Sequence, residues 1–158
     1  MKKTLKIILI VAVVAFAGIQ FIRPNISAAP AAPGDALEAS MQVPDQVEAI
    51  FNRSCADCHT NNTVLPWYSQ VAPVSWWLGN HISDGRRHLN LSIWNTYNSK
   101  RKVDKLKEIC DQVETGEMPL PSYLWVHRYA VMKEGEAKIL CDWSNAEASK
   151  ISSAQPAN

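Results

Sequence analysis

The chain has 158 residues, of which 47% are hydrophobic and 20% are charged, a composition that excludes wholesale disorder and fits one compact domain. The formal net charge is +1, but Lys2, Lys3, Lys6 and Arg23 all flank an apolar run at the N-terminus. The rest of the chain therefore carries an acidic excess, which argues against a nucleic-acid partner because phosphate binding requires a basic face. Four cysteines are too few for a disulfide-stapled mini-fold, so we expect a real hydrophobic core.

Residues 1–23 are the first predicted element, an export segment. Three lysines precede an uncharged and largely apolar run from Ile7 to Ile19, as in a signal peptide or a retained membrane anchor. The run is slightly short for a membrane helix, but no clean cleavage site follows it, since a proline comes directly after the small residues 27–29. We favour the retained anchor. The positive-inside rule then places the domain on the periplasmic side of a bacterial inner membrane, whereas cleavage would release a soluble periplasmic protein.

Two further segments are expected to lie outside the working domain. Residues 24–43 are rich in Pro and Ala, and prolines at 24, 30 and 33 prevent a continuous helix, so this stretch predicts an extended spacer. Residues 148–158 are small and polar, and they predict a flexible tail. The domain itself is therefore expected at 44–147.

The motif that carries chemistry is Cys55-Ala56-Asp57-Cys58-His59, the C-x-x-C-H signature of c-type haem attachment. Two thiols on one helical turn form thioether bonds with the vinyl groups of haem, and the adjacent histidine lies beneath the iron as its proximal ligand. A zinc site would need a second Cys or His pair at short spacing, and a thioredoxin-like pair would need a strand–helix–strand pattern. Neither is present around the motif. We therefore predict one haem c, attached through Cys55 and Cys58 and ligated by His59.

A short helix is predicted to lead into the motif. It starts after Pro44, and one face repeats at helical spacing through Val47, Ile50, Phe51 and Ser54. This face is expected to be buried.

The second axial ligand of the iron is expected to be Met118. It follows Gly116, which ends the preceding helix, and it precedes prolines at 119 and 121, so a stiff loop would present its sulfur. The alternative is that Met118 only fills a gap in the core. His81 is the main competing ligand, and the other candidates are Met132, His88, His127 and, less favoured, Met41.

These features are similar to those of class I cytochromes c. More narrowly, the chain resembles a family of small exported bacterial proteins described as haem-binding domain proteins, which are cytochrome c-like. The resemblance covers residues 45–146, with matching stretches at 55–59, 66–68, 73–78, 80–82, 85–87, 89–92 and 118–123, and at His127. It implies an all-α, cytochrome c-like fold wrapped around one covalent haem, and a role in electron transfer. The segment between the haem motif and Met118 is longer than in the simplest cytochromes c.

A helix from Pro73 to about Asp84 is predicted to lie beside the haem. Val74, Trp77, Leu78 and His81 share one of its faces, and Trp77 and His81 are candidate haem contacts. Simple core packing is the alternative and suits the tryptophans. Arg86 is a candidate partner for a haem propionate, because a guanidinium can hold a carboxylate through two hydrogen bonds; a solvated pair with Arg87 is the alternative.

Two helices are predicted to complete the domain. The first, Ser99–Thr115, has an apolar stripe at Val103, Leu106, Ile109, Cys110 and Val113. Its basic residues between 100 and 107 form a solvated face or a docking site for an acidic redox partner. The second starts near Lys133 and carries Trp143, which the cytochrome c resemblance implies should meet Phe51 on the first helix. Cys110 and Cys141 either pair as a disulfide, which we slightly favour in an oxidising compartment, or remain buried thiols.

The sequence therefore predicts an exported mono-haem c-type cytochrome that carries single electrons between redox partner proteins of a bacterial respiratory or periplasmic chain and is not an enzyme. Two alternatives remain open. One is a haem-based sensor of a small ligand, and the other is a peroxidase-like enzyme with an open distal site near His81 and Arg86.

Overall fold

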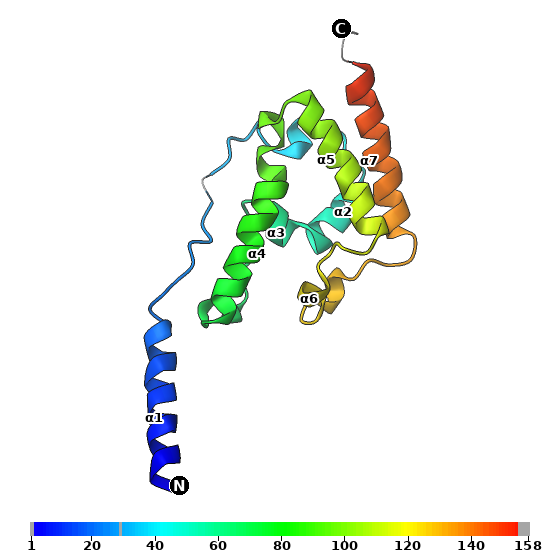
Figure 1. Cartoon of the computed structure of the whole chain (residues 1–158). Helices are drawn as coiled ribbons and strands as arrows, with labels where there is room; N and C mark the ends of the chain where they lie inside the picture. Colours follow the sequence, from blue (N-terminus) through cyan, green and yellow to red (C-terminus); the bar gives the residue numbers. More distant parts are fainter. Residues whose placement is uncertain (1, 29, 155–158) are drawn as a thin grey trace.

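The computed structural model describes residues 2–28 and 30–154, and every regular element in these ranges is helical (Figure 1). The α-helices are α1 (Lys2–Ile19), α2 (Asp45–Ser54), α3 (Ala56–His59), α4 (Val74–His88), α5 (Ser99–Glu114), α6 (Pro121–Leu124) and α7 (Glu136–Ser153). The 3-10 helices are η1 (Leu37–Ala39), η2 (Trp67–Gln70), η3 (Leu91–Thr96) and η4 (Arg128–Ala130). The predicted all-α class is confirmed for these residues.

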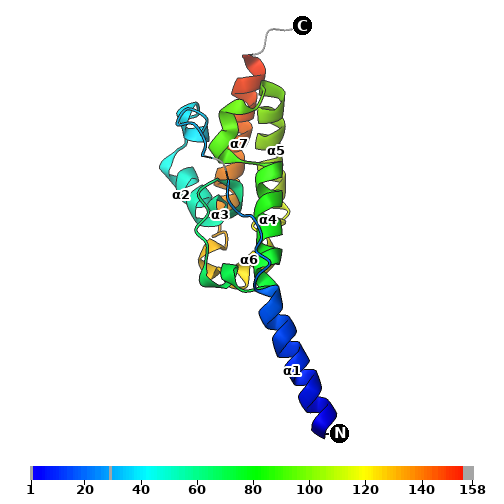
Figure 2. The same ribbon diagram turned by 90° about the vertical axis from the view of Figure 1, so that its left-hand side faces the viewer.

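The main core lies where α2 meets α5 and α7. Helices α5 and α7 run side by side in both views (Figures 1 and 2). On α2 the buried residues are Val47, Ile50, Phe51 and Ser54, the face that helical spacing predicts. Phe51 packs edge-to-face against Trp143 of α7, with ring centroids 5.5 Å apart, so the expected contact between the first and last domain helices is present.

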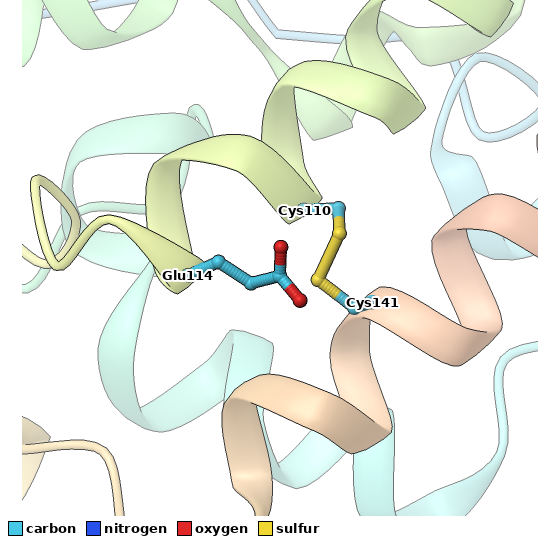
Figure 3. Close-up of side chains that lie close together, drawn as sticks. All are labelled: Cys110, Glu114 and Cys141. Carbon is cyan, nitrogen blue, oxygen red and sulfur yellow. A yellow bond between two sulfur atoms is a disulfide. The ribbon is translucent and has the colours of Figure 1, made fainter.

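A disulfide joins the two longest helices of the domain. Cys110 of α5 and Cys141 of α7 are bonded, and the nearby carboxylate of Glu114 points toward the sulfurs (Figure 3). The favoured alternative for this pair is therefore confirmed. Closing a chain segment of 31 residues stabilises the fold by about 3–4 kcal/mol, mainly by restricting the unfolded chain.

The end of the predicted export segment and parts of the predicted spacer pack against the domain. We call residues 20–26 the strap, because they lie along η2 and α4. The Gln20 side chain exchanges two hydrogen bonds with the backbone of Ala72, and the Trp76 indole N–H donates to the carbonyl of Ile22 at 2.7 Å. Further along, the side chain of Leu37 is fully buried in the main core. Leu37 and the contact between Pro24 and Gly79 hold parts of residues 24–43 on the domain, so this segment is not free along its whole length.

The two ends of the chain leave at opposite ends of the molecule (Figures 1 and 2). No helix in the described residues is long and apolar enough to cross a membrane. At the other end, α7 continues to Ser153 and buries Ala148, so residues 148–153 are helical and not a flexible tail. Met1 and residues 155–158 lie outside the described residues.

Candidate functional site

The C-x-x-C-H motif forms a compact turn at the junction of α2 and α3. Cys55 ends α2, and its carbonyl accepts hydrogen bonds from the N–H groups of Cys58 at 3.2 Å and His59 at 3.0 Å. Both cysteines are free and half-buried. The two thiols and the imidazole are therefore presented within one helical turn, as haem attachment requires.

A hydrogen bond orients the His59 ring. Its Nδ1 lies 2.9 Å from the carbonyl oxygen of Leu89, and a carbonyl can only accept, so Nδ1 carries the hydrogen. The lone pair of Nε2 is then left for a metal. Burial lowers the pKa of His59 below its ordinary value, which keeps the ring neutral and able to ligate.

The pKa values of the two motif thiols are shifted in the opposite direction from those of reactive cysteines. Burial raises the pKa of Cys55 to about 12 and that of Cys58 to about 11. Disulfide-exchange cysteines are thiolates, with pKa values lowered by their surroundings. The motif environment therefore disfavours a thioredoxin-like redox pair.

Helix α4 lies directly against the motif because Gly85 has no side chain. A Cβ at this position would meet the carbonyl oxygen of Cys58 at 2.8 Å and its Cβ at 3.1 Å. Such distances are too short for packing, so only glycine allows this approach. The close fit positions the next residue of α4, Arg86, over the loop that follows the motif.

The guanidinium of Arg86 is hydrogen-bonded to protein on three sides. Nε donates to the carbonyl of Thr60 at 2.8 Å, Nη2 to the Thr63 hydroxyl at 2.8 Å, and Nη1 to the carbonyl of Ile26 at 2.6 Å. Arg86 therefore ties the strap to the segment after the motif. These partners give no support to the predicted pairing with a haem propionate, and they leave Arg86 poorly placed to serve an open peroxidase-like site.

The predicted face of α4 is buried only in part. Leu78 of that face is buried, together with Ile82, whereas Trp77 is 45% exposed and its ring lies 4.3 Å from that of His81. Trp77, His81 and Gly85 follow one another at intervals of four, so the two side chains lie on the same stripe of the helix as the glycine that contacts Cys58. Neither is a core residue.

Met118 lies where the predicted stiff loop leaves α5. Gly116 adopts a left-handed conformation with φ of 72°, and the N–H of Met118 donates to the carbonyl of Gln112 at 3.0 Å. The side chain is half-buried against the same core cluster that Cys55 borders. Among the competing ligands, His88 is exposed, while His81 uses Nδ1 on the carbonyl of Trp77 at 2.9 Å.

A family model described as a haem-binding domain matches residues 14–146. The chain belongs to this haem-binding family. The matched range begins within α1 and includes the strap and the buried Leu37, in agreement with their packing on the domain. No curated protein and no solved structure matches the chain.

The residues present fit a haem. The motif supplies two free thiols and one oriented imidazole, and large apolar side chains stand exposed on η2, on α4 and between α6 and η4. Haem is a broad apolar ring and needs apolar contacts. The exposed set includes Trp67, Trp77, Trp125 and Val126. Of the six tryptophans, Trp94 and Trp143 are core residues, so tryptophan both fills the core and stands on the surface.

One group of site residues was not predicted as a unit. Asp57 of the motif accepts a hydrogen bond from the Tyr123 hydroxyl at 2.7 Å, and Tyr123 stacks on His127. His127 in turn lies 3.0 Å from the hydroxyl of Tyr68. The stretches that carry the sequence resemblance include all four of these positions. Residues so far apart in the chain share no periodic pattern, however, so the sequence does not group them.

Proposed function

We propose that the protein is an exported mono-haem c-type cytochrome that carries single electrons. The observation that carries this proposal is the His59 geometry, with Nδ1 held by the Leu89 carbonyl, directly after two free thiols. Bound at this motif, haem would supply an iron that exchanges one electron without a substrate bond.

In this proposal each residue has a defined role. Cys55 and Cys58 would hold the haem covalently, and His59 would ligate its iron. Met118, on the loop after Gly116, would supply a thioether as the other ligand, which would raise the reduction potential. Trp77 and His81 border the haem along the α4 stripe and limit access of water.

Export is part of the proposal. Attachment of c-type haem takes place outside the bacterial cytoplasm, and the Cys110–Cys141 disulfide also suits an oxidising compartment. We therefore propose residues 1–23 as the export segment and the periplasmic side of the inner membrane as the location. Redox proteins of a respiratory or periplasmic chain are the proposed partners, and the basic residues at the start of α5 suit an acidic one.

The decisive experiment compares Met118→Ala with His81→Ala in the haem-loaded protein. Met118→Ala should keep the haem covalently attached but lose the weak near-infrared sulfur-to-iron band, become partly high-spin and show a lower reduction potential. His81→Ala should leave all three properties close to wild type. The reverse result would transfer the ligand role to His81, and haem that acidified acetone extracts from the wild type would refute covalent attachment.

A sensor or peroxidase-like role predicts a different spectrum. An open sixth position would make the wild-type oxidised protein high-spin and the reduced protein quick to bind carbon monoxide. The three protein partners of Arg86 favour the electron carrier over the peroxidase-like enzyme, because this arginine is engaged in holding the strap.

A further inference from the structure

An aromatic cluster links the loop that carries Met118 to the haem motif. We call residues 115–135, between α5 and α7, the Met118 loop. Within it, Tyr123 stacks on His127 with ring centroids 3.9 Å apart and planes inclined by 12°. The Tyr123 hydroxyl donates to Oδ2 of Asp57 at 2.7 Å, and His127 Nε2 lies 3.0 Å from the hydroxyl of Tyr68 in η2. The cluster therefore joins three segments: the motif, η2 and the Met118 loop.

The hydrogen bonds of this cluster have one consistent direction. Nδ1 of His127 lies 3.0 Å from the carbonyl of Tyr123, so Nδ1 carries the hydrogen, and Nε2 pairs with the Tyr68 hydroxyl. Burial raises the pKa of both tyrosines, which keeps their hydroxyls as donors. Both nitrogens of His127 are thus engaged with protein, which gives it no free atom for iron.

The Met118 loop has little else to hold its middle part. Its regular structure is limited to the short helices α6 and η4, and Trp125, Val126 and Tyr129 are mostly exposed. A further tie to α2 is the hydrogen bond from the Ser54 hydroxyl to the carbonyl of Ala130 at 2.9 Å. A segment with so few buried contacts opens easily unless specific hydrogen bonds restrain it.

We propose that Tyr68, Tyr123 and His127 form a latch that holds the Met118 loop closed against the haem motif. This inference rests on the proposed function in one respect: if Met118 ligates the iron, the latch also sets how fast an external ligand can replace it. The three residues are positioning residues, since they act through the loop and through Asp57.

The test uses variants that remove one hydroxyl and keep the ring. Tyr68→Phe and Tyr123→Phe each delete a latch hydrogen bond to another segment. Tyr129→Phe is the matched control, because the long 3.5 Å bond of its hydroxyl to that of Tyr123 stays within the Met118 loop. Two rates are measured on the haem-loaded full chain: carbon monoxide binding to the reduced protein, and chymotrypsin cleavage within residues 123–129, located by mass spectrometry. We expect both rates to rise about tenfold in each latch variant, the factor produced by losing roughly one hydrogen bond, and to change less than twofold in the control.

The two rates separate the latch from the ligand assignment. If neither latch variant differs from Tyr129→Phe in cleavage, the latch is refuted. Faster cleavage with an unchanged carbon monoxide rate would support the latch and refute ligation by Met118, and Met118→Ala should then also leave the spectrum unchanged.

Discussion

At the scale of single residues, the site depends on the absence of a side chain at Gly85. The backbone of α4 comes close to Cys58 only because no Cβ intervenes, and Arg86 then follows in position to bind the loop after the motif. The neighbouring elements cannot separate without losing these contacts. The absence of a Cβ at Gly85 therefore allows α4 to pack directly against the motif.

Gly85→Ala should disturb both packing and haem attachment. The new Cβ would meet backbone atoms of Cys58, which cannot rotate away, so we expect a loss of about 1–3 kcal/mol in unfolding free energy. The yield of covalent haem per protein, measured from the absorbance ratio after purification, should fall as well. Gly34→Ala is the control, because a Cβ there has nothing within 4 Å. Equal haem yields in the two variants would contradict this account.

Residue identity predicted the motif but not the roles of its neighbours. Cys55, Cys58 and His59 are recognisable because their chemistry requires fixed spacing within one turn. Arg86 was a candidate partner for a haem propionate and His127 one of several candidate ligands, yet both have protein partners from distant segments. Such partners depend on tertiary packing, which the local sequence does not contain.

At the scale of elements, an ion pair fixes the start of α7 to the helix that delivers the motif. Arg53 of α2 forms two hydrogen bonds with the Glu136 carboxylate, one of them at 3.0 Å, and the N–H of Lys133 donates to the same carboxylate at 2.7 Å. Hydrogen bonding from Arg53 lowers the pKa of Glu136 below its ordinary 4.5. The pair is mostly buried, with side-chain exposures of 21% and 15%.

This ion pair should make stability fall in acid. A carboxyl whose pKa is lowered on folding contributes stability above its unfolded pKa of 4.5 and loses that contribution as the pH falls through the lower folded value. Glu136→Gln should therefore cost about 1 kcal/mol at pH 7 and flatten the decrease in unfolding free energy below pH 4.5, measured by urea titration at several pH values. The exposed Glu134→Gln serves as the control. An unchanged acid profile in Glu136→Gln would show that other carboxylates dominate.

Elements with one buried face were predictable, and those with two contacting faces were not. Helix α2 packs on one side only, so its apolar spacing identifies all four buried residues. Helix α4 contacts the strap on one side and the motif on another, and glycines make both contacts close. Glycines add nothing to an apolar stripe, so periodicity identified the buried Leu78 but grouped it with the exposed Trp77.

At the scale of the whole molecule, the domain includes the segment from residue 20 onward. Leu37 shows this most directly, since it is completely buried although the segment around it is dominated by Pro and Ala. The Asn95 side-chain amide also donates to the carbonyls of Gly34 and Ala36, at 2.9 and 3.0 Å. The domain is therefore a helical core against which the strap and the segment around Leu37 are packed.

Leu37→Ala in the full chain tests this boundary. Removing a fully buried leucine side chain should lower the unfolding free energy by about 2–5 kcal/mol, whereas a residue in a free spacer would contribute almost nothing. Urea unfolding of the haem-loaded protein measures the difference. Leu65→Ala, at a side chain that is 42% exposed, should have a much smaller effect. Equal losses would mean that Leu37 is not part of the core.

The strap also determines where the leader can be exchanged or removed. A cut among the small residues 27–29 would detach Gln20, Ile22 and Ile26, leaving the indole of Trp76 and one arm of Arg86 to water and uncovering Gly79, which now lies against Pro24. If the protein is secreted with a foreign leader peptide, we therefore expect folded protein only when the junction precedes Gln20. For biochemical work, the natural grafting point is the end of α1, well before the first residue that sequence patterns would assign to the domain.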